Sequence, residues 1–120
     1  MESLDEVFEL FTEERRRFAL YYLENANGPV PIEELAEQVY AWEKNGPDEP
    51  ITDDELHRVI LTLEHTHLPK IEDATHIEYD RTNERIQISG LSPEADVLLS
   101  VTRAIERPSK AHDFIADRFG

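Results

Sequence analysis

The central part of the chain, residues 51–88, changes its hydrophobic period from that of a helix to that of a strand. Four apolar residues first recur at helical spacing and, at about 100° per residue, fall within a sector about 100° wide. These residues are Leu56, Val59, Ile60 and Leu63. Thr52 is a candidate N-cap, and the three acidic residues after it suit the positive end of a helix dipole. The pattern therefore predicts a helix with one buried face. Pro69 predicts a break near residue 67 or 68, followed by a short helical turn through Ala74.

Two short segments after this helix alternate apolar and polar residues, as strands with one buried face do. Ile77 and Tyr79 belong to the first segment, and Ile86 and Ile88 to the second. The intervening residues, 80–85, predict a hairpin. A helix followed by a hairpin is the order found in the second half of a winged helix-turn-helix, in which the hairpin is the wing. We therefore expect a mostly α fold with a small β-hairpin wing (α+β), extended by a C-terminal helix.

The predicted helix after Thr52 has a second face, opposite its apolar face. In a winged helix-turn-helix, this face would be presented to the major groove of DNA. The candidate base-contacting residues are Arg58, Leu61, Thr62 and His65. Leu61 could contact a thymine methyl group. Arg81 and Arg85 predict a wing with a basic tip, which would contact the DNA backbone or minor groove.

The first half of the chain predicts three further helices. Leu4, Val7, Phe8 and Phe11 mark the first, and a second begins after Thr12 and ends near residues 27–28. Val30 could form a short strand against the wing. Pro31 opens the third helix, whose inward face would hold Ile32, Leu35, Ala36 and Val39. Nine residues, EKNGPDEPI, then precede the central helix, where a conventional helix-turn-helix has a turn of about 3–4 residues.

The second predicted helix begins with three consecutive arginines. Arg15 and Arg16 are candidate phosphate contacts for a nucleic-acid partner. The alternative is that the run is a solvated helix face, which is the more common role of a charged run.

Composition changes after Gly90, so we divide the chain into a winged helix-turn-helix domain (residues 1–90) and a helical extension (residues 91–120). Ser92 and Pro93 begin a helix that ends at Pro108 and carries an apolar stripe. We expect this extension to pair two subunits in a homodimer. The alternative is that the stripe packs on its own domain. The expected interface residues are Val97, Leu98, Val101, Ile105, Phe114, Ile115 and Phe119.

Two runs of the sequence resemble a known family. They are FELFTEERRRFALYYLENANGPVPIEELAEQV and LEHTHLPKIEDATHIEYD. They are similar to winged-helix domains that recur as short uncharacterised proteins in haloarchaea and that are distantly similar to ArsR-type repressors. The matching residues are Arg15, Glu34 to Ala36, His67, Leu68, Ile71 and Ala74. The resemblance covers about residues 4–90 and implies the fold more firmly than an activity. The metal-sensing cysteines of ArsR-type repressors are absent, so it implies no metal-sensing role.

The charge balance indicates the environment in which the protein works. The chain has 27 Asp and Glu residues against 12 Lys and Arg, a formal net charge of −15. The acidic residues are spread over every predicted helix, and only Lys44, Lys70 and Lys110 are lysines. Such a surface is typical of adaptation to a salt-saturated cytoplasm, because a screening length of about 3 Å at 1 M salt removes most self-repulsion. We therefore expect the source to be an extreme halophile.

Several other classes of protein lack support in the sequence. The chain has no cysteine, no glycine-rich phosphate loop and no nucleophile elbow, so we expect neither an enzyme nor a cofactor. His65 and His67, at i and i+2 on a helix, would point about 160° apart, so we expect no shared metal ion. No apolar run approaches the roughly 18 residues of a membrane-spanning helix, and the N-terminus is acidic. We expect a cytoplasmic protein without membrane association.

Two functions from different classes remain. The first is a DNA-binding transcriptional regulator of a halophilic archaeon, a homodimer that binds double-stranded DNA through its recognition helix and wing. The second is a winged-helix protein–protein interaction module that does not bind DNA. A positive or neutral strip along Arg58, Arg81 and Arg85 would favour the first, and an uninterrupted acidic surface would favour the second.

The dispersed negative charge predicts that the protein needs salt to remain folded. At low ionic strength the like charges repel one another across the compact state, and added salt screens this repulsion. The midpoint of thermal unfolding should therefore be higher in 2 M than in 0.1 M potassium chloride. Equal midpoints at the two concentrations would contradict the halophile interpretation.

Overall fold

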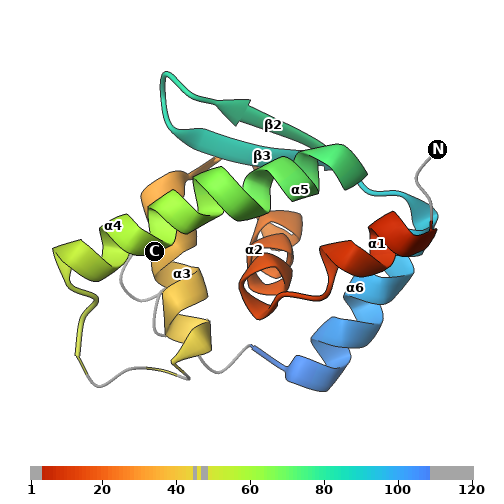
Figure 1. The fold of residues 1–120 in the computed structure, drawn as a ribbon, viewed down its shortest axis with the longest axis horizontal. Helices are drawn as coiled ribbons and strands as arrows, with labels where there is room; N and C mark the ends of the chain where they lie inside the picture. The colour runs from red at the N-terminus through yellow and green to blue at the C-terminus, as the bar shows by residue number, and fades with distance from the viewer. Residues whose placement is uncertain (1–3, 45, 47–48, 109–120) are drawn as a thin grey trace.

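The helices and the small sheet of this computed structural model follow the order expected for a winged helix-turn-helix (Figure 1). The structure describes residues 4–44, 46 and 49–108. Its elements are α1 (Leu4–Leu10), α2 (Glu14–Asn25), β1 (Val30–Pro31), α3 (Ile32–Glu43), α4 (Asp53–Thr62), the π-helical segment η1 (Leu63–His67), α5 (Leu68–Ala74), β2 (His76–Asp80), β3 (Arg85–Gly90) and α6 (Pro93–Glu106). The predicted class, mostly α with a hairpin wing, is confirmed.

The core forms around α2, which packs against α3, α6 and β3. Ala19, Leu20 and Tyr21 of α2 are at most 1% exposed. The predicted inward face of α3 is also confirmed, because Ile32, Leu35, Ala36 and Val39 are all buried. The prediction for α1 is only half right. Of the four predicted apolar residues, Val7 and Phe11 are buried, whereas Leu4 and Phe8 are 60% and 50% exposed. The buried face of α1 is instead formed by Val7 and Leu10.

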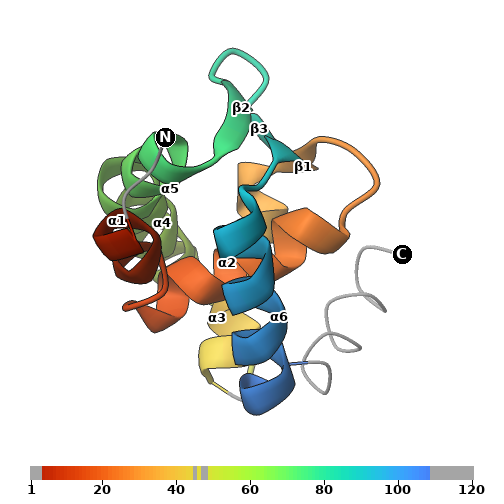
Figure 2. The same cartoon turned by 90° about the vertical axis from the view of Figure 1, so that its right-hand side faces the viewer.

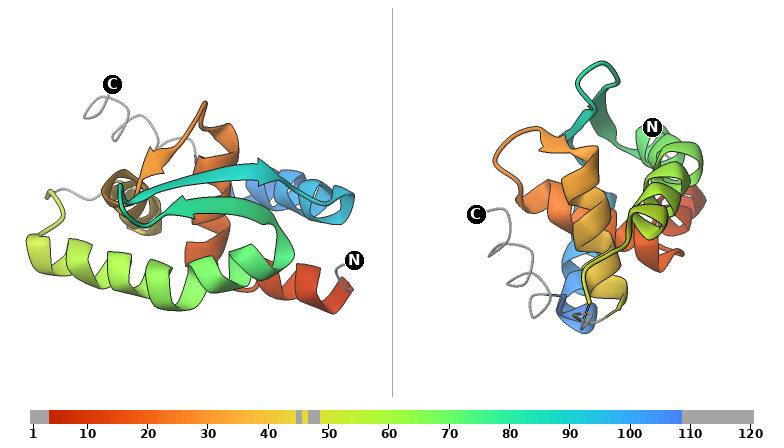
Figure 3. Two further views of the ribbon diagram at one scale, coloured as in Figure 1. Left: turned by 90° about the horizontal axis from the view of Figure 1, so that it is seen from above. Right: turned by 90° about the vertical axis from the view of Figure 1, so that its left-hand side faces the viewer.

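The three strands form an antiparallel sheet in the order β1-β3-β2 (Figure 3). In the hairpin, Tyr79 lies opposite Ile86 and Ile77 lies opposite Ile88. Val30 of β1 lies opposite Ile86 on the other edge of β3, so the strand predicted at Val30 is confirmed. Ile86 is fully buried, which fixes the face that the sheet turns toward α2. The turn of the hairpin projects beyond the helices (Figure 2).

The central helix begins as predicted, with a reciprocal cap at Thr52. The Thr52 hydroxyl accepts a hydrogen bond from the backbone N–H of Glu55, whose carboxylate accepts from the backbone N–H of Thr52. Such a capping box satisfies two of the donors left unpaired at a helix start. Of the predicted buried face, Val59 and Leu63 are buried, and Leu56 and Ile60 are half-buried against the core.

The predicted break near residue 67 or 68 is wrong. The backbone dihedral angles of His67 and Leu68 stay in the right-handed helical region, and α4, η1 and α5 run on as one helix in Figure 3. The segment between α4 and α5 is instead a π-helical turn, in which the Leu68 N–H donates to the Leu63 carbonyl. Because of this wider turn, the helix continues through Pro69 although proline has no backbone N–H to donate.

Each of the four tyrosines links two elements through a glutamate. The hydroxyl of each donates to a carboxylate oxygen at 2.6 Å. The pairs are Tyr21–Glu106, Tyr22–Glu34, Tyr40–Glu55 and Tyr79–Glu64. They connect α2 to α6, α2 to α3, α3 to α4, and β2 to η1. A hydrogen bond to a charged acceptor is shorter and stronger than one between neutral groups, so each pair is an effective link between its two elements.

Helix α6 packs on α2 and α1 through one face and leaves another in solvent (Figure 2). Ala95 and Leu99 are buried in the core. Most of the predicted apolar stripe lies on a different, exposed face of α6. Val97, Val101 and Ile105 are 62%, 50% and 74% exposed. The alternative, in which the stripe packs on its own domain, is therefore wrong for these three residues. Leu98 is half-buried against the core, and Phe114, Ile115 and Phe119 lie outside the described residues.

Two leucines of the central helix allow a matched test of which face is buried. Leu63 is completely buried, whereas Leu61 is 39% exposed. Leu63→Ala should lower the free energy of unfolding by about 2–5 kcal/mol, because it removes apolar contacts and leaves a cavity. Leu61→Ala should change it by no more than about 0.5 kcal/mol. Denaturant titrations of both variants check this, and equal losses would contradict the orientation of the helix described above.

Candidate nucleic-acid interface

The face of the central helix opposite the core brings together the four residues predicted to contact bases. We call Arg58, Leu61, Thr62 and His65 the outer face. Arg58, Leu61 and His65 are exposed. Thr62 is half-buried, and its hydroxyl donates to the Arg58 carbonyl at 2.8 Å. The spacing i, i+3, i+4 and i+7 places them along one side of the helix, where a groove-bound helix carries its contacts.

Arg58 is the most informative residue of the outer face. Its alternative role is a surface ion pair with Asp54 one turn earlier, which would contribute about 0.3–0.5 kcal/mol. That pair is not formed, and no other side chain in the described part of the chain pairs with Arg58. A guanidinium has five donors in a planar fork, so Arg58 presents an unoccupied bidentate donor to solvent.

The wing carries two exposed arginines, as predicted, but its tip is not basic. The Arg81 guanidinium lies 4.9 Å from the centre of the Tyr79 ring and 4.0 Å from the Glu72 carboxylate, and its side chain is 72% exposed. Arg85 of β3 lies opposite Asp80 of β2 in the hairpin. Asp80 and Glu84 supply two negative charges to the tip, so they cancel the two arginines. The prediction of a basic tip is therefore wrong, because the charges of residues 80–85 add up to zero.

The turn at the tip is held by Asp80. One of its carboxylate oxygens accepts from the backbone N–H groups of Thr82 and Asn83, both at 3.1 Å, and the other accepts from the Asn83 amide at 2.7 Å. These hydrogen bonds, led by that of the Asn83 side chain, lower the pKa of Asp80. The two arginines are thus carried on a defined turn.

The wing is joined to the central helix by the Tyr79–Glu64 hydrogen bond, which the sequence pattern did not indicate. Burial, together with this bond, raises the pKa of Tyr79 to about 12, so its hydroxyl remains a donor throughout the neutral range. Glu64 lies on η1 next to His65. The contact therefore fixes the wing relative to the outer face.

The structure does not place Arg15 and Arg16 at a phosphate-binding surface. Arg15 donates through Nε and Nη2 to the two carboxylate oxygens of Glu43 at 2.9 and 2.8 Å. Arg16 is 3% exposed and donates to the Glu9 carbonyl at 2.6 Å. The prediction that Arg15 and Arg16 contact phosphates is therefore wrong. The alternative of a solvated face is also wrong, because these side chains hold neighbouring elements together.

His67 lies on the inner side of η1, close to these arginines. It is 4% exposed, and its Nδ1 has no hydrogen-bond partner in the described residues. Burial, assisted by the positive charges of Arg16 and Arg15, lowers the pKa of His67 below its ordinary value of 6.5. The outward-facing His65 lies two residues away, so the pair cannot chelate one ion. No group of three or more metal-ligating side chains occurs within the described ranges.

The fold and the outer face define a winged helix-turn-helix protein with an exposed central helix and a charged wing. A family model described as a domain of unknown function, DUF7344, matches residues 8–87, two thirds of the chain, so the protein belongs to that family. The matched span contains the outer face and most of the wing and ends before α6. No curated protein and no solved structure matches the chain. Among the described residues, no helix has the length and apolar character needed to cross a membrane.

The buried His67 predicts a pH dependence of stability. Its pKa is lower in the folded than in the unfolded protein, so the unfolded chain binds the extra proton as the pH falls below about 6.5. The free energy of unfolding should therefore decrease between pH about 7 and 5. His67→Gln should remove part of this decrease, because glutamine does not titrate.

Denaturant unfolding of the parent and the variant at several pH values above about 5 checks this, since most carboxylates stay ionised there. Parallel pH dependences for the two proteins would contradict the assigned role of His67.

Proposed function

We propose that this protein is a DNA-binding transcriptional regulator whose central helix enters the major groove. The observation that carries the proposal is the outer face, and above all the exposed Arg58 guanidinium, which has no partner among the described residues. Burial does not account for an arginine at this position, and neither does an ion pair. A guanine presents two acceptors to the major groove that fit such a fork.

The remaining contacts follow from the positions of the side chains. Thr62 and His65 would reach base edges beside Arg58, and Leu61 would meet a thymine methyl group. Arg81 and Arg85 would hold the backbone or the minor groove of flanking DNA. The Tyr79–Glu64 hydrogen bond supports this arrangement, because it keeps the wing in a fixed position beside the outer face.

The net charge of −15 requires that DNA binding operate in strong salt. At low salt the acidic surface would repel the phosphates. In molar salt the screening length is about 3 Å, so long-range repulsion is removed while hydrogen bonds made at contact persist. The proposal therefore includes a halophilic archaeon as the source, with the protein acting in its salt-rich cytoplasm, and a distant relation to ArsR-type repressors.

We also propose that α6 pairs two subunits. The side chains of Val97, Val101 and Ile105 recur every four residues and form a stripe that its own domain leaves exposed. A stripe of this kind is self-complementary about a twofold axis. Two subunits would then present two outer faces to two half-sites on one side of the duplex.

A second candidate function uses the same fold to bind another protein and not DNA. The charge-balanced wing tip and the acidic surface favour a winged-helix module that binds another protein. In that case Arg58 would be an ordinary surface charge, which the following experiment can decide.

Arg58→Ala should relax sequence specificity at one base pair of each half-site, because a bidentate arginine–guanine contact contributes about 1–3 kcal/mol of discrimination. Arg58→Lys is the matched control, since it keeps the charge and loses the fork. Both variants should lose specificity, but Arg58→Lys should retain more of the affinity for unrelated DNA. Melting temperatures should stay close to that of the parent.

Selection of binding sites from a randomised duplex pool in molar potassium chloride measures the sequence specificity, and titration with the selected and with unrelated duplexes measures the affinity. If Arg58→Ala selected the parent's sites with undiminished affinity, Arg58 would be excluded from the base contacts. If the parent itself selected no shared sites, the DNA-binding proposal would give way to the protein-interaction module.

Replacing Val101 by glutamate should separate the two subunits, because it puts a charge in the centre of the proposed apolar interface. Ser100→Glu is the matched control, since Ser100 is exposed on α6 and its side chain points about 100° away from that of Val101 around the helix axis. Sedimentation at high salt should show a dimer for the parent and for Ser100→Glu, and a monomer for Val101→Glu. A monomeric parent would exclude the proposed interface.

A further inference from the structure

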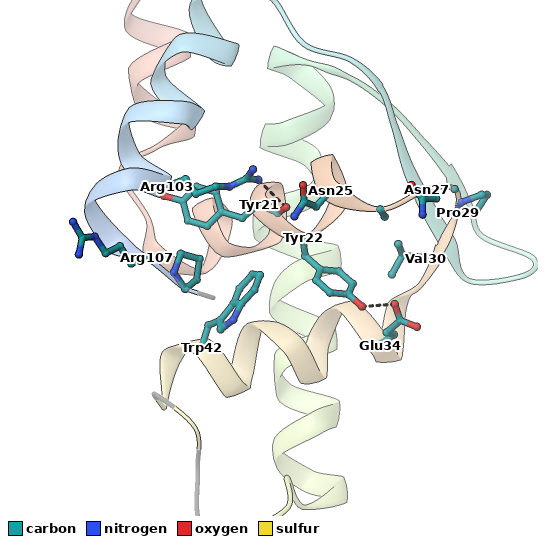
Figure 4. Close-up of a pocket in the computed structure, with 13 residues that line it drawn as sticks. Tyr21, Tyr22, Asn25, Asn27, Pro29, Val30, Glu34, Trp42, Arg103 and Arg107 are labelled. Carbon is teal, nitrogen blue, oxygen red and sulfur yellow. Dashed lines mark hydrogen bonds between the residues drawn. The ribbon is translucent and has the colours of Figure 1, made fainter. Parts of the chain in front are cut away.

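A cavity of about 630 Å³ lies between the C-terminal part of α2, the loop that leads to β1, helix α3 and the end of α6 (Figure 4). Its volume falls within the range of about 300–1,000 Å³ that is usual for small-molecule sites. None of the described residues that line it belongs to α4, η1 or the hairpin. The cavity is therefore separate from the proposed DNA-binding surface.

Three aromatic side chains, Tyr21, Tyr22 and Trp42, line the cavity. The rings of Tyr22 and Trp42 lie edge to face, with centres 6.1 Å apart. Aromatic faces attract cations because of their negative quadrupole potential. The Arg103 guanidinium, 5.3 Å from the centre of the Tyr21 ring, shows this type of contact within the same cavity.

Glu34 supplies a negative charge at the β1 end of the cavity. Its carboxylate is half-buried and accepts a hydrogen bond from the Tyr22 hydroxyl at 2.6 Å, which Figure 4 shows as a dashed line. No basic side chain in the described part of the chain pairs with Glu34. A half-buried carboxylate without a counter-charge favours a cationic ligand.

The two arginines of the cavity do not supply that counter-charge. Arg103 pairs with Glu24 at 2.7 Å and donates to the Tyr21 carbonyl at 2.9 Å. Arg107 donates to the Ala104 carbonyl at 3.3 Å, and its guanidinium points away from the three rings in Figure 4. The cavity therefore combines aromatic walls with one carboxylate that no basic side chain of the described residues contacts.

We infer that this cavity binds a small planar organic cation, held by the Glu34 carboxylate at one end and by the aromatic side chains along its body. A planar amidinium or aromatic ammonium group could donate to the Glu34 oxygen that Tyr22 does not use, while its ring packs against Tyr22 and Trp42. An organic anion of the same shape is disfavoured by Glu34 and by the net charge of −15.

The cavity is also connected to the DNA-binding elements. Val30, in its wall, pairs with Ile86 of β3, and α3, which carries Glu34 and Trp42, packs on α4. If the proposed function holds, a ligand here is therefore an effector of DNA binding. This regulatory role rests on the proposed function, whereas binding of the cation does not.

Trp42 is the sole tryptophan of the chain, so its fluorescence reports on the cavity. The full-length protein in 2 M potassium chloride is titrated with benzamidinium and, separately, with benzoate, which has the same ring and the opposite charge. Benzamidinium should produce a saturable change in fluorescence. Benzoate should bind at least about tenfold more weakly, since a charge-assisted hydrogen bond to Glu34 is replaced by like-charge repulsion.

Variants of the cavity locate the binding. Glu34→Gln should weaken benzamidinium binding about tenfold while keeping the acceptor for Tyr22. Glu33→Gln removes the same charge from the exposed neighbouring position and should bind like the parent.

The assignment is overturned if benzamidinium and benzoate bind equally, if neither binds, or if Glu34→Gln and Glu33→Gln have the same effect. Because the measurement uses no DNA, a negative result leaves the proposed function standing. Conversely, a failure of the DNA selections would not affect this titration.

Discussion

The arrangement of the helices depends on glutamate carboxylates that accept hydrogen bonds from neighbouring elements. Each tyrosine donates to one of them, and each pair spans two elements, so these bonds connect α6, α2, α3 and α4 in one chain of contacts and join β2 to η1. Arg15–Glu43 and Arg17–Glu106 add bidentate pairs along α2. A protein with so many carboxylates thus uses several of them to join its elements. The phenolic and guanidinium donors give such bonds without requiring lysine.

This constraint also determines what remains available for function. Because the arginines of α2 are occupied by Glu43, Glu106 and backbone carbonyls, they do not form a basic surface. On the central helix, the Arg58 guanidinium has no partner among the described residues, and its side chain points into solvent on the side opposite the core. Since the wing is fixed beside it through Tyr79, the outer face and the two wing arginines form one arrangement of exposed donors. The DNA-binding proposal relies on this arrangement and not on net charge.

Much of the fold could be predicted from local patterns. The apolar period of residues 56–63, the cap at Thr52 and the alternation around Ile86 are local, and the structure confirms all three. The π-helical turn was missed, because Pro69 favours a break unless tertiary contacts hold the helix together. The internal roles of Arg15 and Arg16 were also missed. Their partners include Glu43, 28 residues from Arg15 along the chain, and no local pattern indicates such a pairing.

The candidate site divides in the same way. The outer face follows from helical geometry, so Arg58, Leu61 and His65 could be placed in solvent from the sequence alone. The charge balance of the wing tip could have been counted from Asp80 and Glu84. The cavity beside Glu34 could not be predicted, because its walls combine residues between 21 and 42 with the end of α6, which only the tertiary fold brings together.

We propose that the protein recognises DNA sequence through the central helices of two subunits. Mapping the genomic sites that the tagged full-length protein binds in its own cells is the most direct test. The sites should be discrete and share an inverted repeat, with half-site centres about 10–10.5 base pairs apart or a multiple of that. Recovery of no sites above background, or of sites without a shared motif, would contradict the proposal.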